Sequence, residues 1–188
     1  MALVTLSKVK QYGDQDTITN PERDDLLTTL IDRVTTQFET YCGRTFESAE
    51  TTEYLDGGGI KFLFPAQYPI TSVSGIWSNS SWDWDDDDLI SSDDYRIKND
   101  NYIVLKSSTF SNYDQNIKIT YTHGYTADDI PEDLQQACIE ETLRKWKSRN
   151  KIDVLSVSLE DGSITHLTKD LLPQTIMTLN RYKKRSIY

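Results

Sequence analysis

The sequence lacks the features that mark several classes of protein. It has 188 residues but only two cysteines, Cys42 and Cys138, so we expect two buried free thiols in a reducing compartment and no framework of disulfides. It has no run of about 18 apolar residues, so no segment is expected to span a membrane. Residues 1–10 hold few apolar side chains and no cleavage-site pattern, unlike a secretory signal.

Basic side chains are also scarce. Lys and Arg number 20 against 30 Asp and Glu, a net charge of −10, so tight coating of a nucleic-acid backbone is not expected. The charge is uneven, because residues 1–130 carry a net −12 and residues 131–188 a net +2. A basic cluster stands near the end of the chain: Arg181, Lys183, Lys184 and Arg185. It is either a solvated helix end or a docking tail for an acidic partner.

Motifs for catalysis and metal binding are missing. The two histidines, His123 and His166, have no Cys or Glu at ligand spacing, and no Gly-x-Ser-x-Gly turn occurs. The three glycines at 57–59 are followed by Lys61 within an apparent strand, which is typical of a hairpin turn and not of a phosphate-binding loop. We therefore predict that the chain is not an enzyme, with no catalytic residues and no cofactor.

Helical periodicity occurs at both ends of the chain. Residues 5–12 predict a short amphipathic helix, and a long helix follows, with Asn20 as its cap, Pro21 in its first turn and Gly43 as its stop. A second long helix begins at Pro131 and a last one at Pro173.

Charged pairs are expected on the outside of the helix that follows Pro131. The spacing of four residues favours ion pairs between Glu140 and Arg144 and between Glu141 and Lys145.

Residues 51–125 have the period of two that is typical of strands. A hairpin is expected over 52–64 with the glycines as its turn, and further strands over 70–77, 95–97, 102–105 and 117–121. Apolar and polar residues alternate weakly over residues 154–159, which favours a short strand before a turn expected at 161–162. These patterns predict an α+β fold, mainly a helical bundle with a β-rich insertion of antiparallel hairpins. We expect one domain over 1–188, with helical parts at about 1–46 and 130–188 and the β-rich insert at about 50–126.

The most unusual segment is a polar insertion over residues 78–94. Asp83, Asp85 and Asp87 are the only candidate metal ligands, but the spacing, central glycine and closing Glu of a calcium loop are missing. The segment is either a solvated or disordered loop or a site for a divalent cation or a protein partner. Trp82 and Trp84 favour a partner, because exposed tryptophans are enriched at interfaces.

Several motifs in order along the chain resemble one protein family. They are LVTLSKVKQYG at residues 3–13, GRTF at 43–46, YPI at 68–70 and IPEDL at 130–134. Together they resemble the head–tail connector proteins of tailed bacteriophages, also called adaptor or head-completion proteins. The aspartate-rich insertion departs from the short loop usual in that family, so the resemblance assigns it no role.

The resemblance implies a structural virion protein that forms a ring, typically of twelve copies. Such a ring binds beneath the portal protein after DNA packaging, extends the DNA channel and provides the docking surface for the next stopper or tail protein. Independently of the resemblance, the net negative charge predicts only weak contact with passing duplex DNA, and the lack of a long apolar run predicts no membrane partner. The expected location is the virion neck, and the host cytoplasm during assembly.

The resemblance also implies which residues meet partners. The portal-facing candidates lie in the last helical segment: Pro173, Ile176, Leu179, Arg181, Tyr182, Lys183, Lys184 and Arg185. Exposed aromatic residues are candidates for contacts between subunits or with the tail: Trp77, Trp82, Trp84 and Tyr125.

One alternative from a different functional class stays open at this point. In it, the chain is a non-enzymatic binding module that uses aromatic side chains of the sheet and the loop of residues 83–88 to bind a carbohydrate or a divalent cation.

Overall fold

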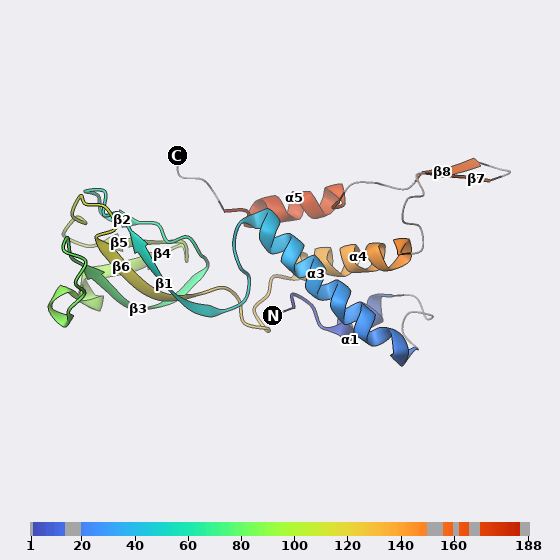
Figure 1. Cartoon of the computed structure of the whole chain (residues 1–188), viewed down its shortest axis with the longest axis horizontal. Coiled ribbons are helices and arrows are strands. Elements are labelled where there is room, and N and C mark those ends of the chain that lie inside the picture. Colours follow the sequence, from blue (N-terminus) through green and yellow to red (C-terminus); the bar gives the residue numbers. More distant parts are fainter. Residues whose placement is uncertain (1, 14–19, 150–155, 160–161, 166–169, 185–188) are drawn as a thin grey trace. The chain divides into compact units, whose positions relative to one another are not determined.

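The chain folds into two compact units in a computed structural model that describes residues 2–13, 20–149, 156–159, 162–165 and 170–184. One unit comprises Met1–Gly43 and Ile130–Tyr188, and the other comprises Arg44–Asp129. Figure 1 shows that helices dominate the first unit and strands the second. The α+β class is therefore confirmed, but a mainly helical fold is not, because the whole second unit is built on strands. The single-domain organisation stays a prediction.

Four α-helices and a two-stranded hairpin make up the described part of the first unit. The elements are α1 (Leu6–Tyr12), the 3₁₀ turn η1 (Pro21–Arg23), α3 (Asp24–Cys42), α4 (Glu132–Ser148), β7 (Ser156–Leu159), β8 (Gly162–Thr165) and α5 (Pro173–Tyr182). β7 and β8 pair antiparallel. Of the turn expected at 161–162, residue 161 lies outside the described residues.

Of the expected capping residues, Gly43 ends α3 as predicted, and Asn20 caps the 3₁₀ turn that precedes the helix. The Asn20 side chain accepts a hydrogen bond from the backbone N–H of Glu22 at 3.0 Å, and Pro21 opens one 3₁₀ turn before the α-helix begins at Asp24. At the other end Gly43 has a φ of 67°, a left-handed conformation that costs residues with a side chain about 1–2 kcal/mol. The sequence therefore located the C-terminal end of α3, whereas the α-helix begins three residues after the expected Pro21.

The apolar faces of the helices meet in one core. Buried core side chains come from all four helices: Val9, Leu27, Ile31, Val34, Phe38, Cys42, Leu134, Cys138, Trp146 and Leu179. Burial raises the pKa of the Cys138 thiol to about 12, so the thiol stays protonated at neutral pH and packs as a small apolar group.

Glu141 is buried in α4, so the expected exposed pair with Lys145 is wrong. The Glu141 side chain is 0% exposed, and its Oε1 accepts hydrogen bonds from Nε of Arg144, at 2.9 Å, and from Nη2 of Arg144. Its Oε2 accepts from the backbone N–H of Leu172 at 3.3 Å. A buried carboxylate needs several directed donors, and the guanidinium fork supplies two of them. The Arg144 guanidinium therefore pairs with Glu141, and the expected pair with Glu140 is not found in the described part of α4.

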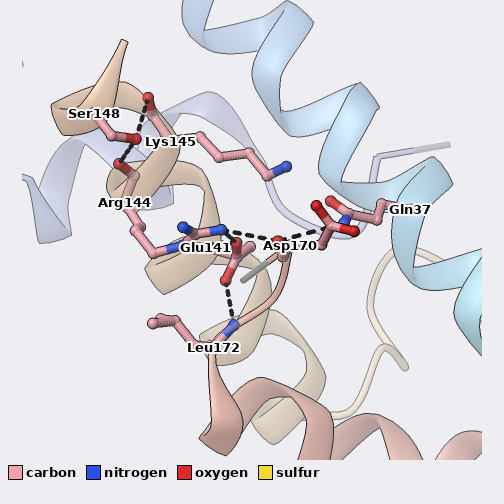
Figure 2. A network of polar contacts seen from close by, with 7 residues as sticks. All are labelled: Gln37, Glu141, Arg144, Lys145, Ser148, Asp170 and Leu172. Atoms are coloured by element: carbon pink, nitrogen blue, oxygen red, sulfur yellow. Dashed lines mark hydrogen bonds and ion pairs between the residues drawn. The ribbon is translucent and has the colours of Figure 1, made fainter. Parts of the chain in front are cut away.

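This carboxylate belongs to a network that joins three segments of the helical unit (Figure 2). Nη2 of Arg144 also donates to the backbone oxygen of Asp170 at 2.9 Å, and Nε2 of Gln37 on α3 donates to the same oxygen at 3.4 Å. The network thus fixes, against both long helices, the chain that leads into α5.

Two three-stranded antiparallel sheets form the second unit. Its strands are β1 (Ala49–Leu55), β2 (Phe62–Leu63), β3 (Ile70–Ser78), β4 (Tyr95–Lys98), β5 (Tyr102–Leu105) and β6 (Ile117–His123), and two 3₁₀ turns, η2 (Asp86–Asp88) and η3 (Ser92–Asp94), lie between β3 and β4. The sheet orders are β1-β6-β3 and β2-β5-β4. The strands expected over 70–77, 95–97, 102–105 and 117–121 are all present.

The hairpin predicted over 52–64 is wrong. β1 pairs with β6 over seven residues and β2 pairs with β5, so the strands on either side of the glycines belong to different sheets. The reason is that β6 offers β1 a full row of partners, whereas β2 is only two residues long. The backbone N–H of Gly57 donates to Oδ1 of Asn116 at 2.8 Å. The glycine segment therefore crosses from one sheet to the other.

One core serves both sheets. Its buried members are Leu63, Ile70, Ile76, Ile103, Leu105, Phe110, Ile117, Ile119 and Tyr121. Tyr121 also ties the loop of residues 65–69 to the sheet, because its hydroxyl donates to Oε1 of Glu53 at 2.7 Å and accepts from the backbone N–H of Gln67 at 3.0 Å. Burial and the nearby Glu53 raise the pKa of Tyr121, so this hydroxyl stays protonated.

Replacing Glu141 tests the buried network of the helical unit. We expect Glu141→Gln to lower the free energy of unfolding by about 1.5–3 kcal/mol, because an amide does not match the charge of Arg144. Urea unfolding followed by far-ultraviolet circular dichroism measures the change. The control is Glu140→Gln, which removes the same charge from a half-buried position and should change stability by less than about 0.5 kcal/mol. Equal losses for the two variants would show that the network contributes little.

The glycine crossover makes a second prediction. A Cβ at Gly57 would lie 1.9 Å from the backbone oxygen of Ser111, whereas a Cβ at Gly58 would find its nearest neighbour at 3.7 Å. Gly58→Ala should lower the free energy of unfolding by about 1–2 kcal/mol, because Gly58 has a positive φ of 61° that a residue with a side chain adopts unfavourably. We expect Gly57→Ala to lower the melting temperature further, because backbone would have to move. A smaller effect at Gly57 than at Gly58 would contradict the close packing described here.

Candidate functional site

The predicted portal-facing residues lie on α5 and just after it. Pro173, Arg181, Lys183 and Lys184 are exposed, and Ile176 and Tyr182 are half-buried. Leu179 is 0% exposed and packs in the core, so its side chain supports the helix and is not available to a partner. Arg185 lies outside the described residues.

Contacts with α3 and α4 hold α5 and the residues after it in place. The Tyr41 hydroxyl on α3 donates to Oδ1 of Asn180 at 2.8 Å, and the backbone N–H of Lys184 donates to the oxygen of Cys42 at 2.8 Å. Asp133 on α4 accepts from the Tyr182 hydroxyl at 2.5 Å. The basic end of the described chain is therefore presented from a docked backbone.

The cations of this segment are only loosely paired. Nη1 of Arg181 lies 3.4 Å from a carboxylate oxygen of Asp133, and Nζ of Lys183 lies 5.2 Å from the ring centre of Tyr41. Lys183 and Lys184 follow α5, and the backbone hydrogen bond from Lys184 to Cys42 holds them at the C-terminal end of α3, where the helix dipole favours positive charge. This surface is suited to an acidic partner.

Three of the four predicted aromatic contact residues lie on or beside the β1-β6-β3 sheet. Trp77 and Trp84 are half-buried, and of the three only Trp82, at 63%, is exposed. Trp77 lies across from Lys118 in the sheet, and Nζ of Lys118 is 4.6 Å from its ring centre. Trp84 packs on Tyr54 with a centroid distance of 6.0 Å. Trp77 therefore lies on β3 and Trp84 packs against β1, the two strands on either side of β6.

Tyr125, the fourth aromatic candidate, has an internal role. Its hydroxyl accepts a hydrogen bond from Nη2 of Arg44 at 3.3 Å. The Arg44 side chain is 3% exposed and its guanidinium also lies 3.9 Å from the ring centre of Tyr68. Cation–π contacts of this kind stabilise a packed arginine. The Tyr125 ring therefore helps to build the start of the β unit.

The aspartate-rich insertion is exposed but locally ordered. Nδ2 of Asn79 donates to the backbone oxygen of Asp83 at 2.7 Å and to Oδ2 of Asp88 at 2.6 Å. Across η2 the backbone N–H of Asp85 donates to Oδ2 of Asp88 at 3.3 Å, and the backbone N–H of Asp88 donates to the backbone oxygen of Asp85 at 3.1 Å. Within the described residues no group of three or more His, Cys, Asp or Glu side chains is placed to share a metal ion. The structure thus leaves Asp83, Asp85 and Asp87 apart from any such cluster.

One surface was missed by the sequence reasoning. The outer face of the β2-β5-β4 sheet carries three aromatic rings, those of Phe62, Phe64 and Tyr102, with Arg96 and Lys98 beside them. The signal was present, because outward and buried residues alternate in each of these strands. Strand pairing, which the sequence does not show, was needed to bring them together.

The two units differ sharply in charge. Residues 44–129 contain 15 acidic and 6 basic side chains, a net −9, and the rest of the chain contains 15 acidic and 14 basic, a net −1. None of the helices in the described part of the chain has the length and apolar character that crossing a bilayer requires. The β unit is thus the acidic part of the molecule.

Chains in solved structures of gene transfer agent particles share this fold. A chain from the virion of a native gene transfer agent (GTA) particle matches with a TM-score of 0.64 and 11% identity, over 99% of this chain and 92% of that one. A chain from the neck of an empty GTA particle, computed with C6 symmetry, matches with a TM-score of 0.61 and 10% identity, over 99% and 92%. A chain from the neck of a native GTA particle, computed with C12 symmetry, matches with a TM-score of 0.60 and 11% identity, over 97% and 90%.

Comparison of the sequence with models of protein families identifies its relatives. The chain matches no curated protein significantly. The model described as head completion protein, however, matches residues 2–185, which include both units and the acidic insertion. This match agrees with the motifs at 43–46, 68–70 and 130–134. The chain therefore belongs to the head completion protein family, the structural proteins of the head–tail connector in the phage virion neck.

Proposed function

We propose that this chain is a subunit of a twelvefold ring that binds beneath the portal protein, extends the DNA channel and provides the docking surface for the next stopper or tail protein. The observation that carries the proposal is the family match over residues 2–185. The shared fold with a chain of a neck computed with C12 symmetry supports the ring. In this role the chain acts by geometry and not by catalysis. It would occupy the neck of the virion after passing through the host cytoplasm during assembly.

The portal-facing surface in this proposal is the end of α5 and the residues that follow. Arg181, Lys183 and Lys184 are exposed, and they stand on a backbone already docked against α3. Preorganised cations lose little conformational entropy when an acidic surface binds them. In the sequence Arg185 follows this segment, and the exposed Pro173 at the start of α5 is the other end of the proposed portal-facing region.

The acidic charge of the β unit suits a channel that DNA must pass through. Twelve copies of the chain would carry a net charge of about −120. Acidic side chains near a channel repel phosphate over roughly the 8–10 Å that salt leaves unscreened. Duplex DNA would then slide past with weak contact.

Reversing the basic charges tests the portal-facing surface. We expect Lys183→Glu combined with Lys184→Glu to weaken binding to the cognate portal ring at least tenfold, which corresponds to about 1.4 kcal/mol. Surface plasmon resonance at two salt concentrations measures the dissociation constant and its salt dependence.

The matched control for this test is Lys8→Glu combined with Arg33→Glu, which changes the same charge at exposed positions on α1 and α3. This variant should bind the portal like the wild type. If both double variants bind equally well, the assignment of the portal-facing surface is wrong.

The ring itself is tested by electron microscopy of the purified chain mixed with its portal. We expect an added layer of density with twelvefold symmetry on one end of the portal. Portal particles that show no added layer at saturating concentrations of the chain would contradict the proposed function as a whole.

A further inference from the structure

The outer face of the β2-β5-β4 sheet is divided into an aromatic half and a cationic half. Phe62 pairs with Val104 and Val104 with Arg96, which makes one row across the three strands. In the next row Tyr102 pairs with Lys98, and the Phe64 ring lies 5.5 Å from the Tyr102 ring. The residues between them in each strand, Leu63, Ile103 and Ile97, point to the core.

Exposure and missing partners set this face apart. Phe62 is 44% and Phe64 39% exposed, and the two rings stack with a centroid distance of 6.4 Å. Arg96 and Lys98 are exposed, and among the described residues no carboxylate lies within 4.0 Å of either cation. An apolar cluster with unpaired cations at its edge has the composition of a protein interface.

The same chain carries a segment that complements this face. Residues 82–88 contain Trp82, at 63% exposure, and five aspartates that have no ion-pair partner in the described structure. The segment is held in shape before any partner binds, because Asn79 bonds to both of its ends. The two surfaces are complementary, because the indole of Trp82 suits the aromatic rings of the sheet face and the aspartates suit its cations, Arg96 and Lys98.

Contacts hold the acidic segment on the other sheet of its own chain. The indole N–H of Trp82 donates to the backbone oxygen of Asp114 at 3.1 Å, just ahead of β6. Trp84 packs on Tyr54 of β1, and Leu89 bridges to Trp77 of β3. No hydrogen bond, ion pair or ring contact within residues 44–129, all of which are described, joins residues 82–88 to the outer face of β2-β5-β4. The two complementary surfaces of one molecule are thus both open.

We propose that the outer face of the β2-β5-β4 sheet binds residues 82–88 of the neighbouring copy in the ring. The inference rests on the proposed ring function and names the surfaces that hold its subunits together. Different patches on each copy then meet head to tail, which is the type of contact that closes a ring. Pairing cations with carboxylates also offsets the repulsion between copies whose β units carry a net −9. The same net charge disfavours nucleic acid as the occupant.

Cysteine pairs test the contact directly. We expect chains with Lys98→Cys, mixed with chains with Asp87→Cys and assembled on the portal, to form a disulfide-linked dimer under mild oxidation. The native Cys42 and Cys138 are buried in the helical unit, so they add little background. The control replaces Asp87→Cys by Asp128→Cys, an exposed acidic position of the same unit outside the insertion. The dimer should form severalfold more from the Asp87→Cys pair, and equal yields would overturn the proposal.

Charge reversal gives a second, independent test. Arg96→Glu with Lys98→Glu should abolish the ring layer on the portal, and so should Asp85→Lys with Asp87→Lys. Each copy contributes both surfaces, so a chain that carries all four substitutions should regain the ring. Circular dichroism confirms that each variant is folded. Normal assembly of both double variants, or failure of a folded fourfold variant to regain the ring, would overturn the proposal.

The outcomes separate this inference from the proposed function. If the wild-type chain forms its ring but neither the cysteine pair nor the charge reversals has an effect, the inference is wrong and the proposed function stands. If the wild-type chain forms no ring on the portal, both are wrong. If the purified chain binds a single-stranded or duplex oligonucleotide and loses this binding with Arg96→Glu and Lys98→Glu, the face is a nucleic-acid site and the inference is overturned.

Discussion

The β unit depends on the pairing of β6 with two strands at once. Ile117, Ile119 and Tyr121 point inward from this central strand and are buried, so a shift of one residue would move all three to the surface. Burial of these three residues fixes the register of β6, and in this register Tyr54 of β1 and Trp77 of β3 lie on either side of Lys118. It therefore determines where the acidic insertion is attached and which surface of the sheet remains exposed.

Charge is the second constraint on this molecule. The helical unit is nearly neutral and presents three exposed cations, Arg181, Lys183 and Lys184, close together at the end of α5, while the β unit carries almost all of the net negative charge. Many like-charged copies in a ring repel one another unless their contacts pair opposite charges or bury apolar groups. The structure offers both kinds of contact on the β unit. This makes an acidic subunit compatible with a closed assembly.

Local patterns were sufficient to predict most of the elements. Gly43 marked the end of α3, and Asn20 and Pro21 marked the 3₁₀ turn before it, because capping is decided by residues a few positions apart. The alternation over β3 to β6 likewise identified strands, because side chains in a strand point in turn to opposite faces. The family resemblance, carried by short motifs in a fixed order, agrees with the match over residues 2–185.

Long-range packing decided what these patterns did not. The sequence alone determined the α+β class, the helix ends, most of the strands and the uneven charge, since each depends on residues that are close in the chain or on composition. The tertiary structure alone decided that β1 pairs with β6, that Glu141 is buried, and that Phe62, Tyr102 and Lys98 share one face. Those outcomes depend on which strands and helices become neighbours. The neighbours are determined by the surface area that residues far apart in the chain bury together, and a local pattern does not contain that information.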